Sequence, residues 1–313
     1  MLWKPLVLVF TLLLSPLCAG EADGKPGGGR RFGGSGPGPR LPEGTRSFRD
    51  LAYADVHPRN KLDLFVPKSD KPLPLLVWIH GGAFMAGSKE GAGECLPFLN
   101  QRYAVASINY RLSQHAVFPA LVHDCKGALR WLRAHAKEYN LDAGHIGVWG
   151  SSAGGYLVAM LGVTAGVKEL EGDVGGNLEC SSRVQAVCDY FGPTDFLQMD
   201  SQAPPNSAIK HDAPGSPESK LLGGPIQDNK EKAAKANPIT YVTKDAAPFL
   251  IVHGDADNLV PYGQSKLLQE ALQKAGADST FLTVPGKGHG GFPPNQYHPK
   301  VLAFFNKHLK AGQ

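Results

Sequence analysis

The feature that most constrains this chain is a serine between two glycines, in Gly150-Ser151-Ser152-Ala153-Gly154. It follows a short apolar run at residues 146–149, and it opens a segment at residues 156–161 whose composition predicts a helix. A strand, a sharp turn and a helix in this order are the setting in which a G-x-S-x-G pattern exposes a nucleophilic serine. Short glycine turns also arise by chance, so the motif alone leaves a plain strand-to-helix turn open. A catalytic interpretation needs a base, an acid and an oxyanion hole elsewhere in the chain.

Strand-like and helix-like patterns alternate from residue 46 onward. Apolar runs typical of buried strands occupy residues 73–79, 103–109, 146–149, 184–191, 249–253 and 280–284, and residues 62–66 alternate like an edge strand. Helices are predicted at residues 123–138, 156–161, 263–275 and 299–309. Repeated β-α-β units predict the α/β class, with a parallel sheet covered by helices on both faces.

Residues 196–238 break this alternation. They contain prolines at positions 204, 205, 214, 217, 225 and 238 and show little apolar periodicity. Long insertions inside compact domains are usually functional or mobile. Because this one lies between two strands whose C-terminal ends should flank the serine, we predict a small cap over the pocket. A solvent-facing excursion far from the site is the alternative.

The first 45 residues differ from the rest of the chain. Residues 1–20 combine a basic residue, an apolar run and small residues before position 21, which is the layout of a secretory signal peptide. Residues 21–45 are rich in glycine and proline and predict a disordered linker, which leaves residues 46–313 as the catalytic domain. We therefore expect a protein secreted to the periplasm or outside the cell, with no stable membrane insertion after signal cleavage. A retained membrane anchor is the alternative.

The charge of the chain gives no reason to expect a nucleic-acid partner. Its formal net charge is +4, and this falls to +2 without residues 1–45. The predicted catalytic domain is therefore close to neutral, whereas nucleic-acid binding calls for a basic patch or stripe.

Four cysteines follow the signal peptide: Cys95, Cys125, Cys180 and Cys188. A secreted protein can form disulfides, but their spacing is neither a dense disulfide framework nor a metal pattern. Cys188 lies in a strand-like run and is predicted to be a buried thiol. A bridge between Cys180 and Cys188 would require the chain to fold back between them. The chain has no H-E-x-x-H pattern, so we expect no catalytic metal.

A serine hydroxyl needs a base within hydrogen-bond reach, and the base needs an orienting acid. For a serine at such a turn, the partners follow in the order Ser, Asp or Glu, His. His289 lies in a glycine-rich loop after the last predicted strand, and Asp255 and Asp257 follow the strand at residues 249–253. We favour Asp257, which lies further along its loop and can extend toward His289, whereas Asp255 is placed to cap the turn. The Asp-x-Asp-Asn string also resembles part of a calcium loop, but the rest of that pattern is missing.

The segment His80-Gly81-Gly82-Ala83-Phe84 directly follows a predicted strand and lacks bulky side chains at its centre. Such a loop can turn the N–H groups of Gly82 and Ala83 toward the serine, and the N–H of Ala153 is a further oxyanion donor. Other histidines border apolar elements and are expected to be structural: His80, His123, His145 and His253.

Several motifs together resemble the α/β-hydrolase superfamily: His80 to Phe84, Asn109-Tyr110-Arg111-Leu112-Ser113, Gly150 to Gly155 and His253-Gly254-Asp255-Ala256-Asp257. The chain is most similar to esterases related to hormone-sensitive lipase, and within them to the bacterial feruloyl/acetyl-esterase-like (BD-FAE-like) group. This resemblance implies an eight-stranded, mostly parallel sheet, a triad of Ser152, Asp257 and His289, and oxyanion donors at Gly82, Ala83 and Ala153. Ala83 stands where many relatives have a third glycine, so the shape of the hole near the acyl group is expected to differ.

The sequence thus predicts a secreted serine carboxylic-ester hydrolase that forms an acyl-enzyme and needs no cofactor. Phe84, Tyr190 and Phe292 border the motif loops and are candidates to line the substrate pocket, although each could belong to the core. The expected partner is a small-molecule or polysaccharide-linked ester, of acyl, acetyl or feruloyl type. A serine peptidase of the prolyl-oligopeptidase type and a non-catalytic binding module on a hydrolase fold are the alternatives. The particular ester and the oligomeric state cannot be read from the sequence.

Overall fold

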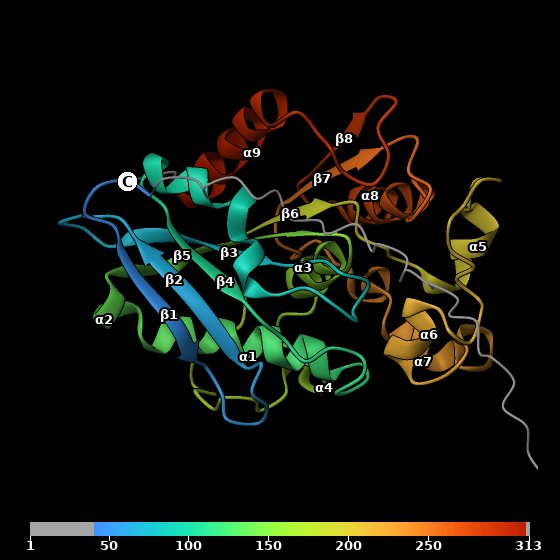
Figure 1. Cartoon of the computed structure of the whole chain (residues 1–313), viewed down its shortest axis with the longest axis horizontal. Helices are drawn as coiled ribbons and strands as arrows, with labels where there is room; N and C mark the ends of the chain where they lie inside the picture. Colours follow the sequence, from blue (N-terminus) through green and yellow to red (C-terminus); the bar gives the residue numbers. More distant parts are fainter. Residues whose placement is uncertain (1–40, 311–313) are drawn as a thin grey trace, which may run out of the picture. The chain divides into compact units, whose positions relative to one another are not determined.

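An eight-stranded sheet forms the centre of residues 41–310, the part of the chain that the computed structural model describes (Figure 1). The strands stand in the order β1-β2-β4-β3-β5-β6-β7-β8. The pairings β1–β2 and β2–β4 are antiparallel, and the others are parallel. The mostly parallel, eight-stranded sheet expected from the sequence is confirmed. Its strands are β1 Arg46–Ala52, β2 Lys61–Val66, β3 Leu73–Ile79, β4 Ala104–Ile108, β5 Leu141–Ser151, β6 Ala186–Tyr190, β7 Phe249–Gly254 and β8 Ser279–Val284.

The prediction that residues 62–66 form an edge strand is wrong. β2 pairs with β4 on one side and with β1 on the other, so β1 is the edge. β1 was missed because its sequence, Arg-Ser-Phe-Arg-Asp-Leu-Ala, is mostly exposed and lacks the apolar alternation that marks a half-buried strand. A short, charged strand of this kind protects the edge of a sheet from pairing with other chains.

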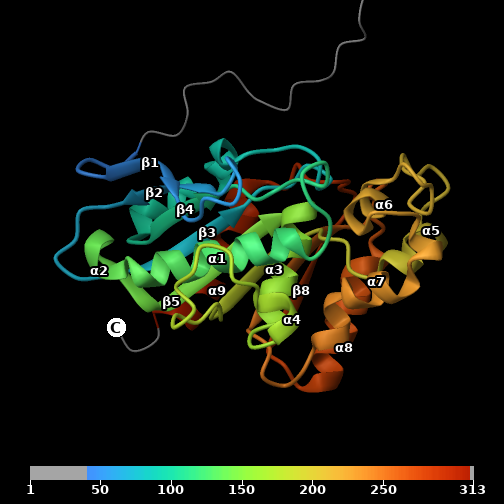
Figure 2. The same ribbon diagram turned by 90° about the horizontal axis from the view of Figure 1, so that it is seen from below.

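Helices cover both faces of the sheet, and alternate residues of β3 face different layers. Leu75 and Val77 belong to the same apolar cluster as residues of α1, α3 and α8, whereas Leu76 and Trp78 cluster with residues of α9. Figure 2 looks onto the face that carries α1 and α3. These long helices are α1 Ala120–Ala134, α3 Ala153–Val163, α8 Gly263–Ala275 and α9 Pro294–Leu309.

The insertion at residues 196–238 folds into short helices, α5 Met199–Gln202, α6 Pro217–Leu222 and α7 Lys230–Lys235, linked by 3-10 turns. The N–H of Ala208 donates to the carbonyl of Asn258 at 2.9 Å, so the insertion is joined to the loop that follows β7. Gln264 of α8 donates to Gln202 at 2.8 Å. The insertion therefore contacts the loop that carries Asp257, and its role as a cap over the pocket stays a prediction.

The predicted signal peptide lies outside the described residues, as does most of the predicted linker. Residues 41–45 are described and form a turn that leads into β1, with the N–H of Thr45 donating to Pro42. Within residues 41–310, no helix combines the length and the apolar character that crossing a membrane requires. The four cysteines in this range, at positions 95, 125, 180 and 188, are unpaired thiols, and Cys188 is buried as predicted. The same residues hold no group of three or more His, Cys, Asp or Glu side chains placed to bind a metal ion.

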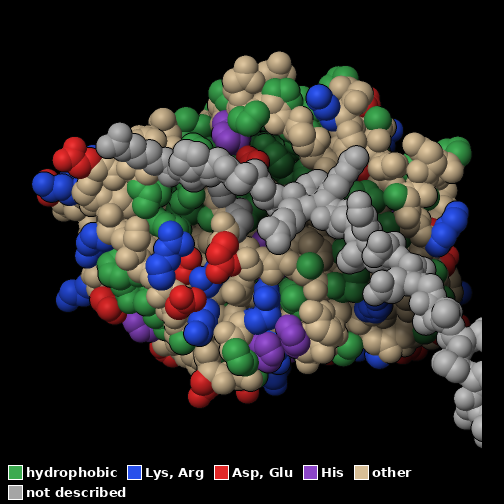
Figure 3. Space-filling model, in the orientation of Figure 1, with side chains coloured by type: hydrophobic (Ala, Val, Ile, Leu, Met, Phe, Trp, Pro, Cys, Tyr) green, Lys and Arg blue, Asp and Glu red, His purple; other side chains and the backbone are tan. Residues whose placement is uncertain are grey.

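Acidic and basic side chains of the described residues lie interspersed on the face that Figure 3 shows. At the β1–β2 edge, for example, Arg49 pairs with Asp63 at 2.6 Å, and Lys89 pairs with Asp50 at 3.0 Å. This mixture agrees with the nearly neutral charge calculated for the domain.

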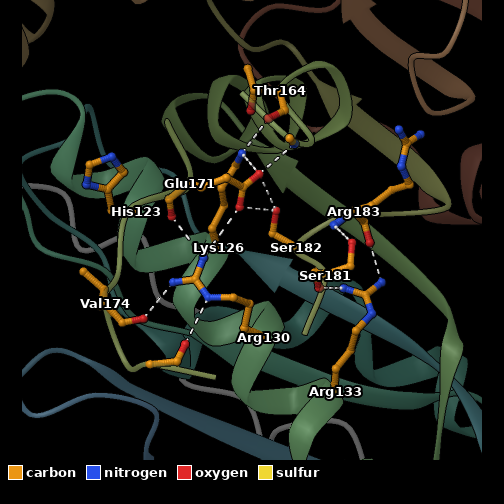
Figure 4. Close-up of polar contacts among 12 residues, drawn as sticks. His123, Lys126, Arg130, Arg133, Thr164, Glu171, Val174, Ser181, Ser182 and Arg183 are labelled. Carbon is orange, nitrogen blue, oxygen red and sulfur yellow. Dashed lines mark hydrogen bonds and ion pairs between the residues drawn. The ribbon is translucent and has the colours of Figure 1, made fainter. Parts of the chain in front are cut away.

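Basic side chains on one face of α1 join this helix to the segment between α3 and β6 (Figure 4). Lys126 Nζ donates to the carbonyl of Thr164 at 2.6 Å and to Glu171 Oε1 at 2.8 Å. Arg130 donates to three backbone carbonyls of the same segment. Arg133 donates to the carbonyl of Ser181 in that segment and to the carbonyl of Ala143 in β5. Glu171 lies in the short helix α4 Lys168–Glu171, and a second short helix, α2 Ala136–Tyr139, follows α1. We call Lys126, Arg130, Arg133 and Glu171 the α1 clamp.

Candidate active site

Ser152 lies in the turn between β5 and α3, so the predicted strand–turn–helix setting is confirmed. Its backbone has φ 57° and ψ −122°, a strained conformation for a residue with a side chain. The flanking glycines make this turn possible. A Cβ atom at Gly154 would lie 2.1 Å from the carbonyl oxygen of Ile79, and one at Gly150 would lie 2.3 Å from the carbonyl oxygen of Gly154. The G-x-S-x-G pattern is therefore a steric requirement of this turn.

Loops from three strand ends bring Ser152, His289 and Asp257 together. Ser152 Oγ lies 2.9 Å from His289 Nε2, and His289 Nδ1 lies 2.7 Å from Asp257 Oδ2. Because the Asp257 carboxylate only accepts, His289 carries its proton on Nδ1 and accepts from the serine hydroxyl at Nε2. The three residues follow β5, β8 and β7, whose C-terminal ends meet at one edge of the parallel sheet.

The two candidate acids have different partners. Asp255 is exposed, and its Oδ1 accepts from the N–H of Gly286 at 2.6 Å, which ties the loop after β7 to the loop after β8. Asp257 is 2 % exposed, and its Oδ1 accepts from the N–H groups of Leu259 and Val260 at 2.8 and 3.1 Å. The geometry therefore brings Asp257, and not Asp255, to His289.

The pKa of Asp257 lies well below its ordinary value of 3.8. Burial raises the pKa of this carboxyl, but hydrogen bonds from His253 and His289 outweigh burial. The buried Asp257 carboxylate therefore stays ionised to lower pH than an ordinary aspartate does.

The loop after β3 packs directly on the serine turn. A Cβ atom at Gly81 would lie 2.7 Å from the carbonyl oxygen of Ser151 and 3.2 Å from Ser152 Cβ. Gly82 has φ 113° and Ala83 has φ 54°, so the alanine at the position of the expected glycine adopts the left-handed conformation. Within the described residues, the N–H groups of Gly82 and Ala83 meet no hydrogen-bond acceptor, which leaves them free to bind an oxyanion beside the serine.

Arg59, which the sequence analysis did not identify, holds this loop from behind. Its guanidinium donates to the carbonyls of Gly87 and Tyr110, both at 2.8 Å, and reaches His80 Nε2 at 3.3 Å. His80 Nδ1 donates to the carbonyl of Gly81 at 2.7 Å, and the His80 ring stacks on Tyr110 with centroids 4.3 Å apart. Burial lowers the pKa of His80 to about 4, so this ring stays neutral and its two hydrogen bonds are fixed.

Comparison with known proteins identifies the family of this chain. Residues 62–272 match the BD-FAE family. The chain belongs to the BD-FAE family. It is also 31 % identical to the esterase LipC of Mycobacterium tuberculosis over 77 % of this chain, and it spans 59 % of the length of that relative.

Solved structures show the same fold as this BD-FAE chain. A truncated carbohydrate esterase from gut microbiota is 36 % identical, with a TM-score of 0.78, over 85 % of this chain and 96 % of that one. A bifunctional GH43-CE protein of Bacteroides eggerthii is 37 % identical, with a TM-score of 0.77, over 84 % of this chain and 38 % of that one. The α/β-hydrolase fold expected from the sequence is confirmed.

Two of the three predicted pocket residues of this BD-FAE chain are buried in its core. Phe84 is 1 % exposed and packs edge-to-face on Tyr156 and Phe196, because its left-handed backbone, with φ 60°, directs the ring inward. Its assignment to the pocket is corrected. Tyr190 is also buried, and it contributes its carbonyl, which accepts from the N–H of Ser152 at 2.9 Å.

Phe292, the third predicted pocket residue, is only partly buried and packs against Phe191 with ring centroids 5.3 Å apart. The Phe191 ring in turn lies 4.5 Å from that of His289. Phe191 has φ 45°, and its N–H donates to the carbonyl of Val252. These two rings therefore form an apolar wall beside His289, and the role of this wall in substrate binding stays a prediction.

Proposed function

We propose that this protein is a carboxylic-ester hydrolase that works through an acyl-enzyme on Ser152. The observation that carries the proposal is the unbroken hydrogen-bond chain from the buried Asp257 through His289 to Ser152. A neutral imidazole held in this tautomer can take the serine proton as the hydroxyl attacks an ester carbonyl. The family and its curated relative, an esterase, support the same chemistry.

The reaction proceeds in two acyl-transfer steps. In the first, Ser152 Oγ bonds to the carbonyl carbon while its proton moves to His289 Nε2, and that proton then leaves with the alcohol as the ester C–O bond breaks. In the second, water gives a proton to His289 Nε2, attacks the acyl-enzyme and releases the acid, and Ser152 regains its proton. Asp257 stabilises the imidazolium in both steps without taking a proton.

The negative charge on the carbonyl oxygen is stabilised by backbone donors at the two loops that meet at the serine. Gly82 and Ala83 present N–H groups from the loop after β3, and Ala153 presents one from the start of α3. Removing one such donor typically costs about 3–4 kcal/mol of transition-state stabilisation. The N-terminal end of α3 adds a favourable dipole at the same point.

We propose an acetyl or feruloyl ester on a polysaccharide as the substrate, and secretion by the predicted signal peptide. Two solved relatives above 35 % identity are described as a carbohydrate esterase and a GH43-CE protein, which supports the substrate class. The complete hydrogen-bond chain argues against a non-catalytic module. No feature of the site favours the peptidase alternative over ester hydrolysis, because the same triad serves both reactions.

Replacing Ser152 by Ala tests the reaction. We expect hydrolysis of p-nitrophenyl acetate to fall about a thousandfold or more, because the nucleophile is lost. The melting temperature should stay unchanged, because alanine keeps the Cβ atom of the serine and its packing. Ser151→Ala, which changes the neighbouring serine, is the matched control and should retain most of the activity. A Ser152→Ala variant with wild-type turnover would show the proposal to be wrong.

The substrate class and the secretion each have a direct measurement. Acetate or ferulate release from acetylated and feruloylated xylan should exceed release of amine from peptide amides, and the reverse order would favour the peptidase.

Mass spectrometry of protein recovered outside the cytoplasm should show an N-terminus near residue 21, and an intact Met1 would contradict secretion by this segment.

A further inference from the structure

Asp257 accepts hydrogen bonds from two histidines on the same carboxylate oxygen. Oδ2 lies 2.7 Å from His289 Nδ1 and 3.1 Å from His253 Nε2, while Oδ1 is occupied by two backbone N–H groups. His253 stands near the end of β7, four residues before the acid, and it is fully buried. A serine attack of the kind proposed above uses only His289, so the mechanism leaves His253 without a role.

The proton position on His253 follows from its neighbours. Its Nε2 faces Asp257 Oδ2 and the carbonyl of Val260, also at 3.1 Å, and both of these groups only accept. Nε2 therefore carries a proton. Its Nδ1 lies 2.7 Å from Ser265 Oγ, which belongs to α8 and is fully buried. A neutral ring, which places no further charge in this buried site, accepts there from the serine hydroxyl.

We propose that His253 is a positioning residue for the reaction, locked by Ser265 as an Nε2–H donor that holds the Asp257 carboxylate in the plane His289 requires. This inference rests on the proposed function. Four donors then fix the carboxylate: two N–H groups of its own loop, His253 from β7 and His289 from the loop after β8. Without His253, His289 would be the one donor to Oδ2 left among residues 41–310, and the carboxylate could rotate with the His289 ring.

The His253 hydrogen bond also affects the proton affinity of Asp257, the carboxylate that contacts His289. Burial raises the pKa of Asp257, and His253 is the foremost of the contacts that lower it. The titratable groups that face this unit are His253, His289 and Tyr262, whose ring lies 5.6 Å from that of His253. Removing this donor from the carboxylate therefore raises the proton affinity of Asp257.

His253→Phe and His253→Gln separate the donor from the packing. Phe keeps an aromatic ring and loses the N–H, whereas Gln keeps an N–H donor near the position of Nε2. We expect kcat for p-nitrophenyl acetate to fall about 10- to 100-fold in His253→Phe with little change in KM, as for other lost orienting partners. The acid limb of its pH–rate profile should move to higher pH. His253→Gln should restore most of the rate and the wild-type limb.

Ser265→Ala keeps the proposal testable if His253→Phe does not fold. This substitution leaves Nδ1 without its donor, so the ring loses one of the contacts that fix its orientation toward Asp257, and we expect a smaller fall in kcat with an unchanged KM. Wild-type kcat and pH profiles in His253→Phe would overturn the inference, and where that variant does not fold, a wild-type kcat in Ser265→Ala would overturn it. Equal losses in His253→Gln and His253→Phe would also overturn it, because they would show that packing matters and the donor does not.

Wild type and Ser152→Ala in the same assay keep this test apart from the test of the proposed function. If wild type is inactive, or if Ser152→Ala is fully active, the proposed function fails. If both behave as expected and the His253 variants match wild type, only the role of His253 is rejected.

Discussion

The α1 clamp and the proposed catalytic set, Asp257, His289 and Ser152, are two networks of buried charge that end in different groups. In the clamp, Glu171 lies between Lys126 and Arg130, and the remaining donors of the two cations reach backbone carbonyls (Figure 4). In the catalytic set, Asp257 and His289 lead to Ser152, and the His289 side chain is 16 % exposed. The first network ends on backbone carbonyls, whereas the second ends at the hydroxyl of Ser152, a partly exposed residue.

Burial of charge therefore does not distinguish a reaction site from a structural joint in this fold. Both networks contain a carboxylate whose pKa is lowered because hydrogen bonds outweigh burial, at Glu171 and at Asp257. The two networks differ in where they lie in the fold and in which polar group stands at their end. The clamp connects the side of a helix to a crossover segment, while the catalytic set lies where parallel strands end.

The largest expected effect is on the acid of the catalytic set. Asp257→Asn should lower kcat about 10³- to 10⁴-fold, because an amide can present an N–H to His289 Nδ1 and favour the wrong tautomer. Steady-state kinetics on p-nitrophenyl esters measures this effect. Asp255→Asn is the matched control in the same loop, and a larger loss there would overturn the choice of acid. A comparable loss in Glu171→Gln would break the comparison between the two networks.

Breaking the clamp should cost stability and leave the chemistry intact. Lys126→Met removes a fully buried cation and leaves Glu171 with Arg130 as its remaining cation in the α1 clamp, so the free energy of unfolding should fall by about 3–5 kcal/mol. Urea unfolding measures this change, and kcat of the folded variant should stay at the wild-type value. Lys137→Met, at an exposed lysine of α2, is the control and should change stability little. A fall in kcat without a fall in stability would contradict this separation of stability from chemistry.

Asp189 belongs to neither network and shows what burial does to a carboxyl group that has few hydrogen-bond donors. It is 1 % exposed, its Oδ1 accepts from the N–H of Gly192 at 2.9 Å, and its Oδ2 has no partner among the described residues. Burial raises its pKa from 3.8 to about 7. Between pH 4 and pH 7 the carboxyl group is ionised in the unfolded chain and protonated in the folded chain. The free energy of unfolding therefore falls as the pH rises from about 4 to 7, and above pH 7 the loss caused by this group stays constant.

Asp189→Asn should remove this penalty, because Asn keeps the acceptor for Gly192 and has no proton to lose. We expect the variant to be more stable than wild type at pH 8, and this difference in the free energy of unfolding should be larger at pH 8 than at pH 4. Its ceiling is about 4 kcal/mol for a shift of roughly three pKa units. Urea unfolding of both proteins at pH 4, 5.5 and 8 measures it. Parallel pH profiles for wild type and variant would show that Asp189 does not titrate in this range.

The parts of the fold and site that were predictable rest on local chemistry. Gly150 and Gly154 are required by the serine turn itself, and His289 lies in a loop whose place follows from strand order. Apolar runs revealed the central strands because both faces of a parallel sheet are buried. β1 and the inward rotation of Phe84 were missed, since one has no apolar period and the other depends on a backbone angle that the sequence does not encode locally.

Supporting residues were missed because their roles depend on distant parts of the chain. Arg59 precedes β2 and acts on the loop after β3, beside the segment that follows β4. His253 was assigned a structural role, and only the fold shows that it shares an oxygen of Asp257 with His289. Nothing in the spacing of these residues distinguishes them from an ordinary surface arginine or core histidine.

The smallest expected effect concerns Arg59, which makes contacts like those of the clamp arginines beside the proposed active site. Arg59 uses its guanidinium as the clamp arginines do, on backbone carbonyls, but the carbonyl of Gly87 belongs to the loop that presents the oxyanion donors. Arg59→Gln should therefore lower kcat about tenfold with little change in KM, because a loosened loop weakens donors that act mainly on the transition state. Arg133→Gln, which loosens the clamp instead, should lower stability and leave kcat unchanged. Equal kcat values for the two variants would mean that the oxyanion loop holds its geometry without Arg59.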